Sequence, residues 1–184
     1  MSEGTICPIA FVKETLFPYA LKALPEVLQQ KWEDSDFQPY IIAFPAAARE
    51  SPETLQAAVE DLTRRDVKVA CLKNLQGYLW QEGYETKAYS TPLFPDVPPK
   101  LQQWHSDGVK ISIYSSGSVF AQKLLFANVA DDAGQGAGQR DMTGLISGWF
   151  DTTNAGFKAE ASSYGKIAAA LEVWSRLSYL WCEC

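Results

Sequence analysis

The stretch Val109-Lys-Ile-Ser-Ile-Tyr-Ser-Ser-Gly-Ser-Val-Phe-Ala-Gln-Lys-Leu-Leu-Phe-Ala-Asn-Val129 decides the fold. Its first six residues place apolar side chains at odd positions, which is typical of a half-buried β-strand. Ser115-Ser-Gly-Ser118 then predicts a turn, and the apolar residues within 119–129 predict a helix. The stretch therefore predicts a strand, a tight turn and a helix, the repeating unit of an α/β protein.

The same alternation continues toward the C-terminus. Residues 145–150 predict a second short strand, and the alanine-rich segment 162–171 predicts a second helix. A short helix at about 97–106 precedes the first strand, and Gly108 ends it. Alternating strands and helices of this kind favour a parallel sheet.

The first half of the chain is predicted to be helical. Residues 10–31 have helical character, but we expect Pro18 and Pro25 to break the helix, because proline lacks the backbone N–H. Residues 32–50 are rich in proline and acidic side chains and predict a loop.

Two further helices are expected before the α/β part begins. Ser51 followed by Pro52 predicts an N-cap and first helical position, with Leu55, Val59 and Leu62 facing a core. A second helix is predicted from Val67 to near Gly83 by apolar residues at helical spacing.

Charge and cysteine content exclude several classes of function. Of the 184 residues, 22 are acidic and 16 are basic, which gives a net charge of −6. We expect no nucleic-acid partner and no membrane docking, because both need clustered Lys and Arg, and no segment is apolar enough to span a membrane. The 4 cysteines form no CxxC pair and the single His cannot complete a zinc site with them, so we expect reduced thiols in a soluble intracellular chain.

Two places along the chain carry candidate chemistry. Ser115 and Ser116 lead into a helix N-terminus, where hydroxyls and backbone N–H groups suit a phosphate; a solvated turn is the alternative. Lys158 follows the second predicted strand and would neutralise a bound phosphate, with a solvated lysine as the alternative. His105 is expected to be structural. Gly134–Gly138 is expected to be a flexible insertion, because it does not fit the GxGxxG pattern and follows no strand.

Four blocks of sequence occur in a characteristic order. The first two are Glu3-Gly-Thr-Ile-Cys-Pro-Ile-Ala-Phe-Val-Lys-Glu-Thr-Leu-Phe-Pro-Tyr19 and Leu72-Lys-Asn-Leu-Gln-Gly-Tyr-Leu-Trp-Gln-Glu-Gly-Tyr84. The third is Ile113-Tyr-Ser-Ser-Gly-Ser-Val-Phe-Ala-Gln-Lys-Leu-Leu-Phe126, and the fourth joins Gly148-Trp-Phe-Asp151, Gly156-Phe-Lys-Ala-Glu160 and Ser163-Tyr164. In content, order and spacing these blocks resemble the enolase-phosphatase (acireductone synthase) family of the haloacid dehalogenase superfamily.

The resemblance implies an α/β fold, a Rossmann-like haloacid dehalogenase core with a helical cap inserted just after the first strand. The cap is expected at 14–91, and the discontinuous core at 1–13 and 92–184. We expect the sheet of this core to be incomplete, because the first strand of the family would precede the Glu3 block and a later strand would follow Leu171.

The resemblance also implies a reaction. The family enolises 2,3-diketo-5-methylthiopentyl 1-phosphate and then removes its phosphate with Mg²⁺, giving acireductone in methionine salvage. By motif matching, Ser115 and Ser116 hold the phosphoryl group, and Lys158 fixes and neutralises it. Glu3 matches the second acid of the Asp-x-Glu motif, at the Mg²⁺ site and in proton transfer. The implied setting is a monomer in the cytoplasm, or also in the nucleus, that acts on a small phosphorylated substrate.

The chain departs from the family pattern where the chemistry starts. Met1 and Ser2 stand where the motif has its nucleophilic Asp and the next residue, and no Asp follows Asp151. The covalent step needs a carboxylate nucleophile. We therefore expect an inactive chain that represents a family member shortened at both ends. Two alternatives stay open, a non-catalytic protein that binds phosphate esters and a related phosphatase with another substrate.

Overall fold

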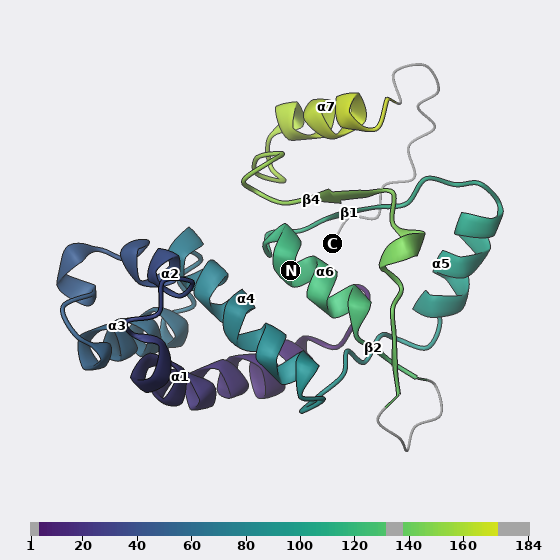
Figure 1. Ribbon diagram of the computed structural model, residues 1–184. Coiled ribbons are helices and arrows are strands. Elements are labelled where there is room, and N and C mark those ends of the chain that lie inside the picture. The colour runs from purple at the N-terminus through teal and green to yellow at the C-terminus, as the bar shows by residue number, and fades with distance from the viewer. Residues whose placement is uncertain (1–3, 132–137, 173–184) are drawn as a thin grey trace. The chain divides into compact units, whose positions relative to one another are not determined.

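Two units make up the chain in the structure, a computed structural model that describes residues 4–131 and 138–172. The helical unit is Val12–Tyr89, and the α/β unit combines Met1–Phe11 with Ser90–Cys184 (Figure 1). The helical unit is thus inserted between two pieces of the α/β unit.

Some expectations concern residues outside the described ranges. Glu3 is one of them, together with Met1 and Ser2. Most of the glycine-rich segment expected to be a flexible insertion falls in 132–137, and Cys182 and Cys184 fall in 173–184.

The helical unit is built on a long helix, α1, that packs against α3 and α4. Its elements are a π-helix at Phe11–Leu16, α1 at Phe17–Lys31, α2 at Gln38–Ile42, a 3-10 turn at Ala46–Ala48, α3 at Pro52–Arg64 and α4 at Ala70–Glu85. Leu24, Leu55, Leu75 and Leu79 are fully buried in this unit. The expected loop at 32–50 therefore contains α2 and the 3-10 turn.

The expectation that proline breaks the first helix was wrong. α1 follows the π-helix without a break, contains Pro18 at its start and continues through Pro25. Pro25 does remove one hydrogen bond from the helix. Leu24 and Leu28 beside it are buried, and burying each such side chain contributes about 2 kcal/mol, which offsets much of that cost.

The predicted start of α3 is confirmed. The Ser51 hydroxyl accepts a hydrogen bond from the backbone N–H of Thr54 at 3.3 Å, and the Thr54 hydroxyl accepts one from the N–H of Ser51 at 2.9 Å. This reciprocal pair satisfies two donors that a helix start leaves open. Leu55 and Val59 are buried as expected, and Leu62 is half-buried.

The α/β unit contains a two-stranded parallel sheet among its described residues. Its elements are α5 at Val97–Ser106, β1 at Ser112–Tyr114, α6 at Val119–Ala127, β2 at Val129–Ala130, β3 at Gln139–Arg140, a 3-10 turn at Thr143–Leu145, β4 at Gly148–Phe150 and α7 at Ala161–Ala170. β1 pairs with β4 in parallel, with Ser112 opposite Gly148 and Tyr114 opposite Phe150. The predicted α/β class is confirmed.

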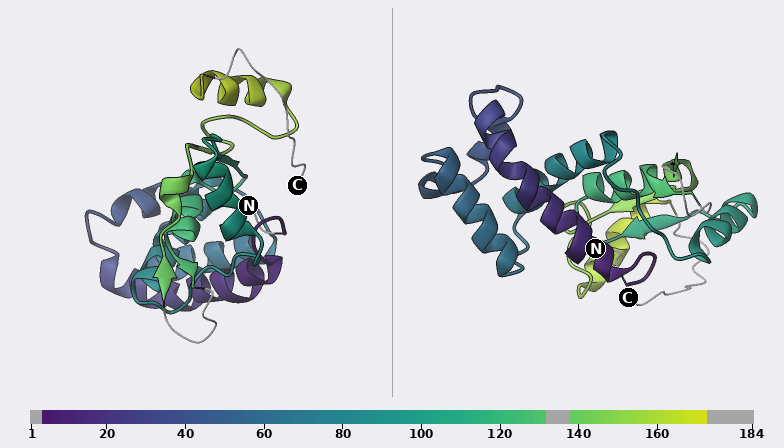
Figure 2. Two further views of the ribbon diagram at one scale, coloured as in Figure 1. Left: turned by 90° about the vertical axis from the view of Figure 1, so that its right-hand side faces the viewer. Right: turned by 90° about the horizontal axis from the view of Figure 1, so that it is seen from below.

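β1, β4 and α6 lie together in all three ribbon views (Figures 1 and 2). One core cluster supports them, formed by Leu101, Ile111, Phe126, Val129, Met142 and Ile146. β1 begins at Ser112, later than the apolar pattern from Val109 suggests, and the side chain of Val109 is 49% exposed.

A second strand pair was not predicted. Val129 and Ala130 pair antiparallel with Arg140 and Gln139, and Val129 also bridges to Thr91. The helix expected to reach Val129 therefore ends at Ala127, because Val129 takes part in this pairing.

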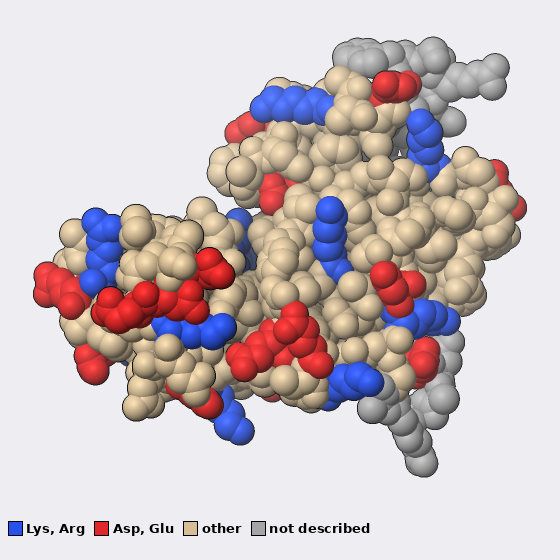
Figure 3. Space-filling model, viewed as in Figure 1, with Lys and Arg blue, Asp and Glu red and all other residues tan. Residues whose placement is uncertain are grey.

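No helix among the described residues is long and apolar enough to cross a membrane. On the face of the helical unit that Figure 3 shows, basic side chains are scattered among acidic ones. That face therefore offers no basic patch of the kind that nucleic-acid binding needs.

We expect Ser51→Ala to lower the free energy of unfolding by about 1 kcal/mol, because the variant loses the side-chain cap of α3. Urea denaturation followed by circular dichroism measures this. Ser35→Ala, at an exposed serine in the turn before α2, is the matched control and should change stability by less than about 0.5 kcal/mol. Equal effects of the two variants would contradict the role of the cap.

Candidate functional site

The candidate site begins at the end of β1. The backbone N–H of Ser115 donates to the carbonyl of Phe150 at 3.0 Å, which continues the β1–β4 ladder by one bond. The Ser115 side chain is fully buried, and its hydroxyl accepts from the N–H of Gly117 at 3.2 Å. Ser116 is half-buried. The two serines therefore differ, since Ser115 shapes the turn and only Ser116 reaches the surface.

The N-terminus of α6 follows directly after this turn. Two of its backbone N–H groups already donate to side chains of the protein. The Ser118 hydroxyl accepts from the N–H of Ala121 at 3.2 Å, and a carboxylate oxygen of Asp151 accepts from the N–H of Val119 at 2.9 Å. The expectation that this helix start offers its N–H groups to a phosphate was wrong for these two donors, because side chains of the protein already bind them.

Asp151 joins the end of β4 to the start of α6. Its side chain is buried, and its second oxygen accepts from the N–H groups of Thr153 at 2.7 Å and Asn154 at 3.1 Å. The carboxylate therefore holds its own turn and the start of α6 together. The sequence signal for the first role is an Asp followed by polar residues after a strand, which favours a side-chain turn of this type.

Gln122 makes a second link between the same two segments. Its side chain is 3% exposed, and its amide nitrogen donates to the carbonyls of Gly117 and Phe150, each at 2.9 Å. The turn after β1 is thus fixed to the end of β4 through a buried side chain that no sequence pattern marks.

Lys158 lies at the same edge of the sheet. Its ammonium nitrogen is 5.8 Å from the centroid of the Tyr114 ring, and Tyr114 directly precedes Ser115. The Lys158 side chain is otherwise exposed. The structure therefore brings Lys158 to the ring of Tyr114, the last residue of β1, while Glu3 lies outside the described residues.

The described residues do not fit a metal site. They contain no group of three or more His, Cys, Asp or Glu side chains that could hold an ion. Asp151 is the carboxylate at the sheet edge, and both of its oxygens already accept backbone hydrogen bonds. His105 is exposed in the last turn of α5.

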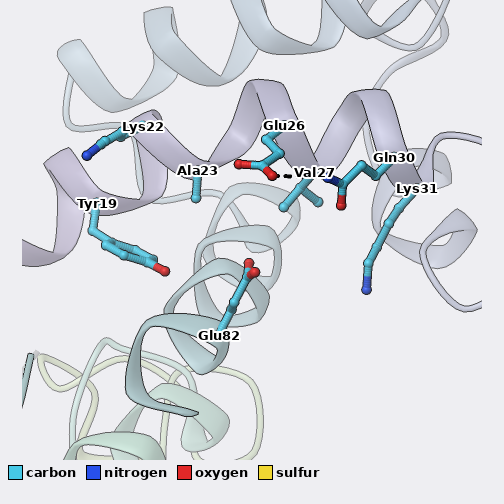
Figure 4. A pocket seen from close by; sticks show the side chains of 8 residues that line it. All are labelled: Tyr19, Lys22, Ala23, Glu26, Val27, Gln30, Lys31 and Glu82. Atoms are coloured by element: carbon cyan, nitrogen blue, oxygen red, sulfur yellow. Dashed lines mark hydrogen bonds between the residues drawn. The ribbon is translucent and has the colours of Figure 1, made fainter. Parts of the chain in front are cut away.

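A separate pocket lies on the helical unit, between α1 and α4 (Figure 4). Lys22, Glu26 and Lys31 from α1 and Glu82 from α4 are among its lining residues. Lys31 donates to the Tyr78 hydroxyl at 2.8 Å, and this hydrogen bond raises the pKa of Lys31, so its ammonium stays charged at neutral pH. Two lysines balance two glutamates here, which favours no particular charge in a ligand.

Comparisons with known proteins identify close relatives, although a scan against models of protein families found no match. The chain is 54% identical over 165 residues to enolase-phosphatase E1 of Verticillium alfalfae, covering 90% of this chain and 62% of that protein. It is 54% identical over 168 residues to enolase-phosphatase E1 of Fusarium vanettenii, covering 91% of this chain and 68% of that protein. The solved UTR4 protein of Saccharomyces cerevisiae has a TM-score of 0.79 and 39% identity, covering 92% of this chain and 73% of that one. The chain thus spans about two thirds of the length of the curated relatives.

We expect Asp151→Asn to lower the free energy of unfolding by about 2 kcal/mol, because an amide NH₂ would face a backbone N–H that needs an acceptor. Asp107→Asn, at an exposed position after α5, is the matched control and should stay within about 0.5 kcal/mol. Urea denaturation compares the two. An unchanged stability of Asp151→Asn would show that this carboxylate does not hold the segments together.

Proposed function

Because the chain belongs to the enolase-phosphatase family of the haloacid dehalogenase superfamily, we propose that its α/β unit binds the phosphate group of a small phosphorylated substrate. Ser116 and Lys158 contact the phosphate directly. Ser115, the other serine expected to hold the phosphoryl group, is fully buried and acts by holding the turn through Gly117.

The position of Lys158 is the observation that carries this proposal. Its ammonium lies 5.8 Å from the ring of Tyr114, the residue before the serine turn. β1 and β4 run in parallel, so the segments after both strands leave from the same edge of the sheet. A hydroxyl-bearing turn and a lysine cation at one edge are complementary to a phosphate dianion.

For the whole protein we propose the reaction that the family resemblance implies. The substrate is 2,3-diketo-5-methylthiopentyl 1-phosphate, which is enolised and then dephosphorylated. The relatives whose names carry both activities, enolase and phosphatase, are matched over 90% or more of this chain, which supports the assignment. A cytoplasmic monomer is proposed from the family resemblance alone.

Magnesium enters the proposal through the family resemblance. Glu3 is the expected ligand and lies outside the described residues. The described residues contain no group of three ligands, so they support no reaction step through the metal. What they supply is a positive charge at Lys158 and a hydrogen-bonding turn at Ser116.

We expect Lys158→Ala to weaken the binding of inorganic phosphate by about tenfold or more, because a charge-assisted hydrogen bond is lost. Isothermal titration calorimetry measures the dissociation constant. Lys166→Ala removes an exposed lysine from α7 of the same unit and should bind like the unaltered chain. Equal affinity of the two variants would refute the role of Lys158.

We expect the 184-residue chain to release no phosphate from a phosphate monoester above background, because Met1 offers no carboxylate to attack phosphorus. Loss of a nucleophile lowers kcat by roughly 10⁶ in a well-studied hydrolase. A colorimetric phosphate assay with the Fusarium vanettenii relative as positive control checks this. Comparable rates for the two proteins would contradict the expectation.

A further inference from the structure

The backbone that carries Lys158 is held by an uninterrupted set of hydroxyl donors. The carbonyls of Gly156, Phe157 and Lys158, three consecutive residues, each accept a hydrogen bond from a side-chain hydroxyl. The donors are Tyr114 for Gly156 at 2.6 Å, Ser163 for Phe157 at 2.9 Å and Tyr164 for Lys158 at 2.9 Å. The loop before α7 is therefore fixed to β1 on one side and to α7 on the other.

The same two tyrosines also contact each other and the lysine side chain. The rings of Tyr114 and Tyr164 meet edge to face, with centroids 5.8 Å apart and planes at 85°. The ammonium of Lys158 lies over the Tyr114 ring, within the distance at which a cation is attracted to an aromatic face. Lys158 is thus held at its carbonyl by one tyrosine and at its charged end by the other.

The loop conformation depends on a glycine and on close packing against Ser163. Gly156 has φ +108°, a conformation that other residues rarely adopt, and a Cβ added there would lie 2.5 Å from the Ser163 hydroxyl oxygen. Ser163 is fully buried. The Phe157 carbonyl that it binds also accepts from the N–H of Glu160 at 3.0 Å. Little freedom remains in the backbone next to Lys158.

We propose that Tyr114, Ser163 and Tyr164 are positioning residues that act through Lys158. A long exposed lysine loses side-chain freedom when it binds an anion, and a backbone and ring that fix it beforehand reduce that loss. The inference rests on the proposed function, because it assigns these hydroxyls to the phosphate-binding role of Lys158.

The first test is phosphate affinity in variants that each lose one hydroxyl. Tyr164→Phe and Ser163→Ala should raise the dissociation constant for inorganic phosphate by about three- to tenfold, the effect of one hydrogen bond. The matched controls are Tyr40→Phe in α2 and Ser106→Ala in α5. Like Ser163, Ser106 donates its hydroxyl to a backbone carbonyl, that of Gln102 at 2.9 Å. Both controls should bind like the unaltered chain.

A double variant separates positioning from general stability. If Tyr164 acts through Lys158, Tyr164→Phe should have no further effect on phosphate affinity in a Lys158→Ala background. An additive effect would overturn the proposal, because Tyr164 would then act on the phosphate by another route or only on stability.

A spectroscopic readout remains informative if the unaltered chain binds no phosphate, a result that would defeat the proposed function. In protein labelled with ¹³C-lysine, we expect the ε-methylene signal of Lys158 to be shifted upfield by the Tyr114 ring and to move toward the exposed lysines in Tyr164→Phe and Ser163→Ala. An unshifted signal, or the same signal in all variants, overturns the positioning role. A merely structural role would lower the thermal midpoint and leave this signal in place.

Discussion

The parallel pairing of β1 with β4 is the constraint on which the candidate site depends. It places the carboxyl ends of two strands at one edge, so the segments that follow Tyr114 and Phe150 start side by side. The hydrogen bond from Ser115 to Phe150 extends the ladder into the serine turn. Asp151 then joins the start of α6 to the end of β4, and Gln122 joins the serine turn to β4 through buried hydrogen bonds. The geometry of the candidate site follows from these few links rather than from any single residue.

Local patterns in the sequence predicted the elements that carry the motifs. Ser51 with Pro52 marked the start of α3, because a helix cap is a short-range interaction that its own residues specify. The strand, turn and helix around Ser115 were predictable for the same reason. The candidate residues Ser115, Ser116 and Lys158 came from these elements and from the family resemblance, and their proximity to one sheet edge followed from the α/β alternation.

Interactions between distant segments could not be predicted. Nothing near Asp151 in the sequence indicates that it binds the N–H of Val119, and nothing near Tyr114 indicates that its hydroxyl donates to the carbonyl of Gly156. Pro25 led to a wrong prediction. The sequence shows that it removes a helical hydrogen bond, but it does not show that the neighbouring leucines are buried and stabilise the helix. The rest of the fold and site therefore depends on contacts that only the folded chain reveals.

The proposal that two segments far apart in the sequence form one phosphate-binding site is tested most directly by nuclear magnetic resonance. The backbone amide signals of Ser116, Gly117 and Lys158 are followed while inorganic phosphate is added to the 184-residue chain. All three should shift along curves that share one dissociation constant, because one anion contacts both segments. Shifts confined to one segment, or different dissociation constants for the two, would contradict a single site.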